Sequence, residues 1–385
     1  MKKQESNYIS REKFFKKCFA FGIGFTVLKN FTLAESPIIN KSIGNNTELQ
    51  KAKYWESLLN KKTRCNLCPN FCELSPEQVS LCHTRKNIDG TLYTMVYSKP
   101  SIITLDLIEK SPLYHYQVDG KVFSIATAGC NLTCQFCQNW ELSQSGPDKN
   151  KTFDLSPAEV IEYAKKNNAN AINFFYTEPF IYYEYMLDIA KLAKKEKMKT
   201  FCVTAGYVNS EPLKEIIPLI DAFVFGLKGF DNNFYKEYIG CELEPIKNSL
   251  KILAKNKDKT WFEIVNLLVP GLNDKDESIK EMCKWIKLEI GEDIPLHFTK
   301  FEPAYKLKDL SPTPIATLEN AYKISKAEGL QYVYVGNIPG HDGNNTYCPR
   351  CNKKIIERVG FTVIKNNLKH GKCSCGHEIS GNWIN

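Results

Sequence analysis

Three cysteines, Cys130, Cys134 and Cys137, stand at C-x3-C-x2-C spacing directly after an apolar run at residues 122–129. A 4Fe–4S cluster needs a ligand on each of four irons, and a compact loop that supplies three thiolates leaves one iron open. Reactive metal sites keep such a position free, whereas structural sites usually close all of theirs. The spacing therefore predicts a cluster that can bind and activate a second molecule. Half of a zinc site is the alternative, although zinc knuckles favour C-x2-C pairs.

Two further groups of cysteines lie toward the ends of the chain. The N-terminal group comprises Cys65, Cys68, Cys72 and Cys82, and it could close a structural zinc site or hold an additional iron–sulfur cluster with an electron-transfer role. The C-terminal group comprises Cys348, Cys351, Cys373 and Cys375, which predicts a zinc ribbon or rubredoxin-like module with a structural zinc. Only Ser374 separates its last pair, which strains a standard knuckle, so that His370 or His377 could substitute as a ligand.

The elements that must position these cysteines follow an alternating pattern. Strand-length apolar runs occur at residues 122–126, 171–176, 199–204, 222–227, 261–268, 295–301 and 332–335. Helical patterns separate most of them, and the first is marked by a capping box of Ser156 and Glu159 with Pro157 in the first turn. Further helical patterns lie at residues 183–195, 212–220, 245–255, 278–290 and 316–328. Consecutive βα units predict an α/β fold whose parallel strands curl into a barrel.

Reactive groups of such barrels gather at the carboxyl ends of the strands. The cysteine loop follows the first predicted strand, Glu178 follows the second, Lys228 the fourth and Gly336 the last. We therefore expect these residues to surround one site.

Composition limits the classes of function. The 385 residues suggest two to three domains, and the clustering of the fifteen cysteines indicates metal ligation in a reducing compartment such as the cytoplasm. The net charge of +8 is concentrated near the ends, because residues 1–30 carry seven Lys and Arg against two Glu, and residues 341–385 carry seven against three acidic residues. The middle is close to neutral, which predicts no nucleic-acid partner.

The leader at residues 1–45 has a charged segment followed by an apolar one at residues 18–28. It is similar to a degenerate twin-arginine (Tat-like) export signal, with Glu12 in place of the second arginine. An amphipathic or disordered leader is the alternative. The apolar run is too short for an ordinary transmembrane helix, and no later segment is expected to span a membrane.

The cysteine loop resembles that of radical S-adenosylmethionine (SAM) enzymes, in which an aromatic residue, here Phe136, precedes the last cysteine. Across residues 54–383 the chain more closely resembles the AmmeMemoRadiSam system radical SAM enzyme family, which is itself similar to pyruvate formate-lyase and other glycyl-radical enzyme activating enzymes. The resemblance is carried in order by the segments G-C-N-L-T-C-Q-F-C-Q-N-W, Y-T-E-P, G-L-K-G-F, P-G-L-N-D, P-L-H-F-T-K-F and Y-V-Y-V-G-N.

This resemblance implies a domain organisation and cofactors. A partial (β/α)6 TIM-like barrel is expected at residues 121–340, with an N-terminal four-cysteine module at residues 50–120 and a C-terminal zinc-ribbon-like module at residues 341–385. The implied cofactors are a 4Fe–4S cluster on the central cysteines and SAM, whose amino and carboxylate groups chelate the open iron. An electron from the cluster then yields methionine and a 5'-deoxyadenosyl radical that removes a substrate hydrogen.

The resemblance also implies roles for individual residues. Glu178 would accept a hydrogen bond from the SAM amino group, although a solvated loop carboxylate is the alternative, and Tyr176 and Thr177 replace two glycines usual in the family. Lys228 could contact the SAM carboxylate or extend into solvent at the barrel rim. Asn139 is expected to shape the cluster surroundings or the adenine pocket.

Two more positions keep alternatives. Gly336 would allow close approach of a nucleotide or simply permit a turn. His297 would face the active cavity or be a satisfied core histidine.

The implied activity is hydrogen abstraction, either from a partner polypeptide, as in glycyl-radical activation, or from a small molecule. An iron–sulfur electron carrier without SAM chemistry is the alternative from another class, and it would need a fourth cysteine near the central loop. The implied partners are a flavodoxin or ferredoxin reductant, a protein substrate, and Memo-like and AMMECR-like proteins.

Overall fold

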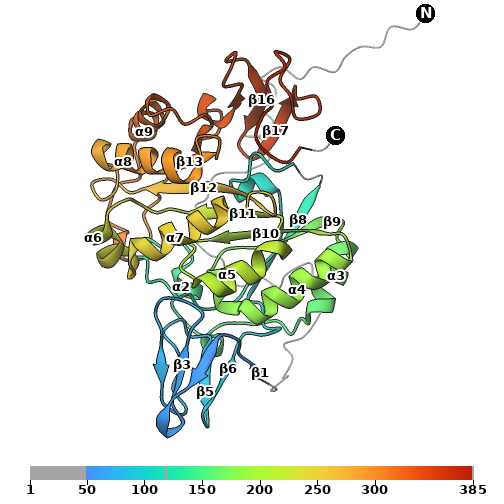
Figure 1. Cartoon of the computed structure of the whole chain (residues 1–385), viewed down its shortest axis with the longest axis vertical. Coiled ribbons are helices and arrows are strands. Elements are labelled where there is room, and N and C mark those ends of the chain that lie inside the picture. Colours follow the sequence, from blue (N-terminus) through green and yellow to red (C-terminus); the bar gives the residue numbers. More distant parts are fainter. Residues whose placement is uncertain (1–48, 118–119, 384–385) are drawn as a thin grey trace, which may run out of the picture. The chain divides into compact units, whose positions relative to one another are not determined.

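The computed structural model describes residues 49–117 and 120–383, so the leader at residues 1–45 lies outside the described part of the chain. Its central element is an eight-stranded sheet in the order β14-β13-β12-β11-β10-β9-β8-β7 (Figure 1). Neighbours from β8 to β14 pair in parallel, and β7 pairs antiparallel with β8. The strands are β7 (Ile102–Asp106), β8 (Lys121–Ala126), β9 (Ala169–Phe174), β10 (Lys199–Thr204), β11 (Ala222–Gly226), β12 (Trp261–Leu268), β13 (Leu296–Lys300) and β14 (Val333–Gly336).

This sheet confirms the predicted α/β, TIM-like class. Its seven parallel strands coincide with the seven apolar runs of the sequence, one more than the six that the family resemblance implies. The strands read as nearly continuous apolar runs because both faces of the sheet are covered, as in β11, where the first four residues are all buried.

Helices connect successive parallel strands (Figure 1). Ser156 and Glu159 form the predicted capping box, in which the Ser156 amide donates to Glu159 Oε2 over 2.8 Å. The helices are α2 (Trp140–Ser143), α3 (Pro157–Lys166), α4 (Tyr183–Lys195), α5 (Ser210–Ile216), α6 (Asn232–Phe234), α7 (Leu243–Ala254), α8 (Asp276–Trp285) and α9 (Ile315–Ala327). Shorter 3-10 segments are η1 (Leu59–Lys61), η2 (Ile108–Lys110), η3 (Pro147–Lys149), η4 (Pro179–Tyr182), η5 (Ile217–Leu219), η8 (Tyr305–Leu307) and η9 (Asp342–Asn344), and η6 (Tyr235–Ile239) and η7 (Ile286–Ile290) are π-helical.

None of the helices in the described ranges is long and apolar enough to cross a membrane.

Two small antiparallel sheets precede the central one. The first contains β1 (Gln50–Lys51), β6 (Thr91–Thr94) and β5 (Arg85–Ile88), and the second contains β2 (Trp55–Ser57), β3 (Thr63–Cys65) and β4 (Glu73–Leu74). Of the N-terminal cysteines, Cys65 ends β3, and Cys68, Cys72 and Cys82 lie in the connections between β3, β4 and β5. β7 also lies within residues 50–120, but it belongs to the central sheet.

A third small sheet follows the central one, with β15 (Thr346–Tyr347), β16 (Lys354–Val359) and β17 (Thr362–Asn366) in antiparallel order. Its buried Arg358 donates hydrogen bonds to the backbone oxygens of Tyr114 and Asn344, and Asn382 exchanges backbone hydrogen bonds with the segment at His115 and Gln117. The C-terminal module therefore packs on the residues that lead into β8.

Candidate functional site

The cysteine loop leaves the carboxyl end of β8 and is held by backbone hydrogen bonds to a distant segment. The Thr133 amide donates to the Ile239 oxygen over 2.9 Å, and the Gln135 amide donates to the Tyr238 oxygen over 2.8 Å. Both acceptors belong to the end of η6, whose turn is completed by Gly240 at a φ of 79°. These two hydrogen bonds fix the path of the loop, whose short sequence around the three cysteines forms no regular secondary structure.

The three thiols form an electrostatically coupled group. Cys134 is buried, and Cys130 and Cys137 are half-buried. Burial raises the pKa of Cys134 to about 11, an effect that Lys228 opposes, and burial together with Cys134 raises the pKa of Cys130. Iron binds thiolates, so the positive charge of Lys228 favours the proton loss that binding requires. Three such donors fit a 4Fe–4S cluster with one iron left without a protein ligand.

Lys228 lies beside this group, two residues after the end of β11. Its Nζ lies 5.9 Å from the ring centroid of Phe136, and its backbone amide donates to the hydroxyl of Tyr235 over 2.8 Å. Burial alone would lower the pKa of Lys228, but Cys134 and Cys137 raise it above its usual value. The side chain therefore supplies a fixed positive charge next to the cysteines.

Glu178 follows β9 and is almost completely buried, with 4% of its surface exposed. Its Oε1 accepts a hydrogen bond from the Thr204 hydroxyl over 2.6 Å, and its Oε2 accepts one from the Ala205 amide over 2.9 Å. Burial raises the pKa of Glu178, and these hydrogen bonds offset part of that rise. A carboxylate has about four acceptor positions, so Glu178 can take a further donor. Its burial does not fit the alternative of a solvated loop carboxylate.

Tyr176 holds the segment that carries Glu178. Its φ of 71° lies in the left-handed region that favours glycine, so the hydrogen bonds of its side chain must hold a backbone conformation that tyrosine rarely adopts. The Tyr176 hydroxyl donates to Asp106 Oδ2 over 2.8 Å, and Lys110 donates to the same hydroxyl over 3.0 Å. Asn139, at the start of α2, donates from Nδ2 to the Tyr176 backbone oxygen over 2.8 Å. The segments after β8 and β9 are thereby joined.

The structure does not bring His297 into this group. The side chain is 1% exposed, and its Nε2 lies 2.6 Å from Oε2 of Glu263. Its ring stacks on Tyr334 and makes an edge contact with Tyr114, both at 4.8 Å between centroids. His297 is the second residue of β13 and thus lies toward the amino end of that strand. This geometry fits a core histidine with its hydrogen bonds satisfied, and it does not fit a side chain that faces the active cavity.

Gly336 ends β14 and pairs in register with Thr299. A Cβ at this position would lie 3.0 Å from Cγ2 of Thr299, which is tighter than ordinary contact. The glycine therefore permits close packing of β13 and β14 at their carboxyl ends.

The C-terminal cysteines converge on one point. The ligand atoms of Cys348, Cys351, Cys373 and Cys375 all lie within 4.8 Å of one another, which suits a single tetrahedral ion. The single-residue spacing is accommodated because the chain turns at Gly376, whose φ is 86° and whose amide donates to the Cys373 oxygen over 2.8 Å. Four sulfurs thus suffice without a histidine ligand.

Three residues that support the site carry no motif in the sequence. Thr204 holds Glu178 together with the amide of Ala205, which the sequence does place at the end of the third predicted strand, and Asp106 and Lys110 hold Tyr176. The available signal was positional, because Thr204 is the last residue of a predicted parallel strand, next to the strand that precedes Glu178.

Comparison with known proteins agrees with this arrangement. Residues 124–286 match the model of the Radical SAM superfamily. An uncharacterised protein of Methanocaldococcus jannaschii is 40% identical over 334 residues, which cover 86% of this chain and 99% of that protein. The pyruvate formate-lyase-activating enzyme of Clostridium pasteurianum is 26% identical over 194 residues, which cover 47% of this chain and 80% of that enzyme.

A solved structure is also similar. A radical SAM methyltransferase from Sphaerobacter thermophilus superposes with a TM-score of 0.44 at 14% identity, over 58% of this chain and 68% of that one.

Proposed function

The chain belongs to the radical SAM superfamily, and on this premise we propose that Cys130, Cys134 and Cys137 hold a 4Fe–4S cluster at which SAM is cleaved reductively. Bound together, the cluster and SAM supply a 5'-deoxyadenosyl radical that removes a hydrogen atom from a substrate. The observation that carries this proposal is the group of three thiols on one loop. The charge of Lys228 and the buried carboxylate of Glu178 both lie close enough to influence the pKa values of these thiols.

The remaining residues orient SAM. Glu178 is held by Thr204 and Ala205 and accepts a hydrogen bond from the SAM amino group, and such charge-assisted bonds are stronger than neutral ones. Lys228 contacts the SAM carboxylate. Asn139 and Gly336 support the nucleotide pocket indirectly, Asn139 by holding the Tyr176 backbone and Gly336 by letting the carboxyl ends of β13 and β14 pack closely.

The test is anaerobic reconstitution with iron and sulfide, followed by reduction with and without SAM. We expect 5'-deoxyadenosine to form in the native protein and to be lost in Cys134→Ala. Cys283→Ala is the matched control, because Cys283 is a buried thiol on α8 that contacts Ser325 and lies in no cysteine group. A reduced cluster that does not respond to SAM would favour an electron carrier and overturn the proposal.

For the substrate, we infer a backbone position of a partner polypeptide. The similarity to pyruvate formate-lyase-activating enzymes supports this choice over a small molecule. Deuterium placed on a candidate partner should appear in 5'-deoxyadenosine, whereas transfer only from small metabolites would support the alternative.

The resemblance to the AmmeMemoRadiSam family supports a wider set of partners. We infer that the enzyme works in the cytoplasm with Memo-like and AMMECR-like proteins and takes electrons from a flavodoxin or ferredoxin. Co-purification of the full chain with these proteins is the corresponding measurement, and a chain that purifies free of them at native expression would count against the assignment.

A further inference from the structure

The four N-terminal cysteines surround one cavity. Two of them, Cys65 and Cys82, are buried, and Cys68 and Cys72 are half-buried. The remaining lining comes from residues of the same module and of the barrel, namely Leu67, Asn70, Ser80, Arg85, Asn131 and Ile181. Four thiols around a shared enclosed space supply a ligand for every iron of a 4Fe–4S cluster.

The geometry of this group differs from that of the C-terminal one. Within the described residues, the C-terminal cysteines are the group whose ligand atoms converge within 4.8 Å, as a single zinc ion requires. The N-terminal thiols instead stand around the cavity, as the ligands of a larger metal group do. The two four-cysteine groups of the chain are therefore arranged differently.

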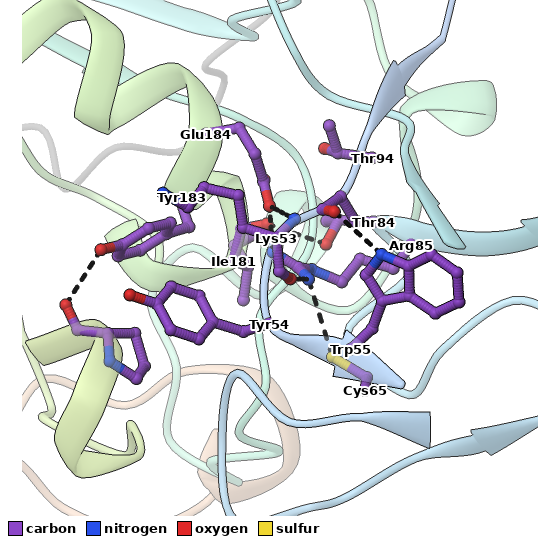
Figure 2. A network of polar contacts seen from close by, with 12 residues as sticks. Lys53, Tyr54, Trp55, Cys65, Thr84, Arg85, Thr94, Ile181, Tyr183 and Glu184 are labelled. Carbon is purple, nitrogen blue, oxygen red and sulfur yellow. Dashed lines mark hydrogen bonds and ion pairs between the residues drawn. The ribbon is translucent and has the colours of Figure 1, made fainter. Parts of the chain in front are cut away.

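Arg85 lines the cavity and forms a buried ion pair with Glu184 (Figure 2). Arg85 has no exposed surface, and its Nη2 donates to Oε1 of Glu184 over 2.7 Å, while Nη1 lies 3.8 Å from the sulfur of Cys65. The Arg85 Nε has no hydrogen-bond partner. An N–H group directed at a ligating sulfur is the type of contact that adjusts the reduction potential of an iron–sulfur cluster. A bound cluster with four thiolates is anionic, and the guanidinium would compensate that charge.

The cavity shares a wall with the central cysteine loop. A Cβ added to Gly129, immediately before Cys130, would lie 2.3 Å from the backbone oxygen of Cys82, so the two segments touch. The side chain of Asn70 donates to the backbone oxygen of Asn131 over 3.0 Å. The Oδ1 of Asn131 is buried without a partner and lines the same cavity. The segments that carry Cys82 and Cys130 are therefore in direct contact.

We propose that Cys65, Cys68, Cys72 and Cys82 hold a second, fully ligated 4Fe–4S cluster that relays electrons to the radical SAM cluster. An external flavodoxin- or ferredoxin-class reductant gives up one electron, and the second cluster accepts it and returns to its oxidised state as it passes the electron on. The relay forms and breaks no bond. Zinc has no redox chemistry and could not serve this role. The relay rests on the proposed function, whereas the presence of the cluster does not.

The first experiment isolates the N-terminal site. The full chain carrying Cys130→Ala, Cys134→Ala and Cys137→Ala is reconstituted anaerobically, and iron, zinc and inorganic sulfide are counted. We expect about four irons and about four sulfides per chain, with a paramagnetic signal on reduction that SAM does not change. Adding Cys68→Ser and Cys72→Ser should remove the sulfide, and adding Cys348→Ser and Cys373→Ser instead should leave it. Zinc without sulfide, or one iron without sulfide, would overturn the proposal.

The second experiment measures the relay with the central cysteines intact. In Cys68→Ser/Cys72→Ser, we expect 5'-deoxyadenosine formation driven by reduced flavodoxin to fall about tenfold or more, and that driven by dithionite to change by less than about twofold. Equal loss with both reductants would contradict a relay. If the native protein makes no 5'-deoxyadenosine with either reductant, the proposed function fails, but the sulfide count of the first experiment still decides whether the second cluster exists.

A separate variant tests the contact with Arg85. Arg85→Lys keeps the buried charge opposite Glu184 but removes the planar fork that reaches Cys65. In the background that lacks the central cysteines, we expect the cluster to be retained and its midpoint potential to become more negative. An unchanged potential with intact cluster content would show that Arg85 has only a structural role.

Discussion

Asn139 donates a hydrogen bond from Nδ2 to the backbone oxygen of Tyr176 over 2.8 Å, and this bond joins the end of the cysteine loop to the segment that carries Glu178. The contact fixes two strand-end segments relative to each other without taking part in metal binding. Loss of such a bond should therefore affect how SAM is held and not whether iron is bound.

Asn139→Ala tests this directly. A neutral hydrogen bond contributes about 0.5–1.5 kcal/mol, so we expect the KM for SAM to rise by about two- to tenfold with unchanged iron content. Asn320→Ala is the control, because Asn320 makes a similar side-chain bond to Asp276 on an exposed helix surface. Lower iron content in Asn139→Ala at native SAM affinity would contradict the expectation.

Glu178→Gln removes the negative charge and keeps the shape. Hydrogen bonds to charged groups contribute about 1.5–3 kcal/mol, so we expect the dissociation constant for SAM to rise by roughly one to two orders of magnitude. Equilibrium binding to the reconstituted protein measures this change. Glu244→Gln, at an exposed position, should bind SAM like the native protein. Native affinity in Glu178→Gln would remove Glu178 from the SAM site.

His115 makes stability depend on pH. Burial lowers the pKa of His115 from its usual 6.5 to about 4. Between these values the unfolded chain binds a proton that the folded chain does not, so stability falls as the pH falls, by at most about 1.4 kcal/mol per pH unit from this group. Above pH 6.5 the group contributes no pH dependence.

Denaturant unfolding at pH 7, 6 and 5 measures this slope. His115→Gln should have a shallower slope than the native protein, by about 1 kcal/mol per unit between pH 6 and 5. His370→Gln, at an exposed position, should leave the slope unchanged. Identical slopes in native protein and His115→Gln would show that His115 does not keep its low pKa.

Metal removal at the C-terminal group should destabilise the C-terminal module. Structural zinc contributes on the order of 10 kcal/mol to the folding of small modules, so we expect Cys375→Ser to lose one zinc per chain and to expose the amides of β15, β16 and β17 to rapid hydrogen exchange. Ser374→Ala changes the neighbouring residue without removing a ligand and should retain the metal. A protected sheet in zinc-free Cys375→Ser would contradict a structural role.

The sequence predicted the central sheet well because its strands are buried on both faces. All seven runs correspond to strands, with ends that shift by at most two residues, as for β9 at Ala169–Phe174. The short strands of the N-terminal module were not predicted, because strands of two to four residues show too little alternation.

Side-chain partners distant in the sequence were also beyond prediction. Arg85 and Glu184 are 99 positions apart, and neither stands in a motif. The cysteine spacing predicted the central donor set, whereas the surroundings of His297 depend on Glu263, which only the register of β12 and β13 brings into contact.

The packing of the C-terminal module on the barrel has a consequence for the order of synthesis. His115 contacts the Ser380 oxygen and Tyr334, and Arg358 contacts Tyr114, so residues made late in synthesis pack on the segment that leads into β8, the first parallel strand. A nascent chain that has reached β14 still lacks the contacts made by Arg358 and Ser380. The segment that leads into β8 therefore gains its C-terminal partners only after residues 358 and 380 have been synthesised, so this part of the fold is completed late in translation.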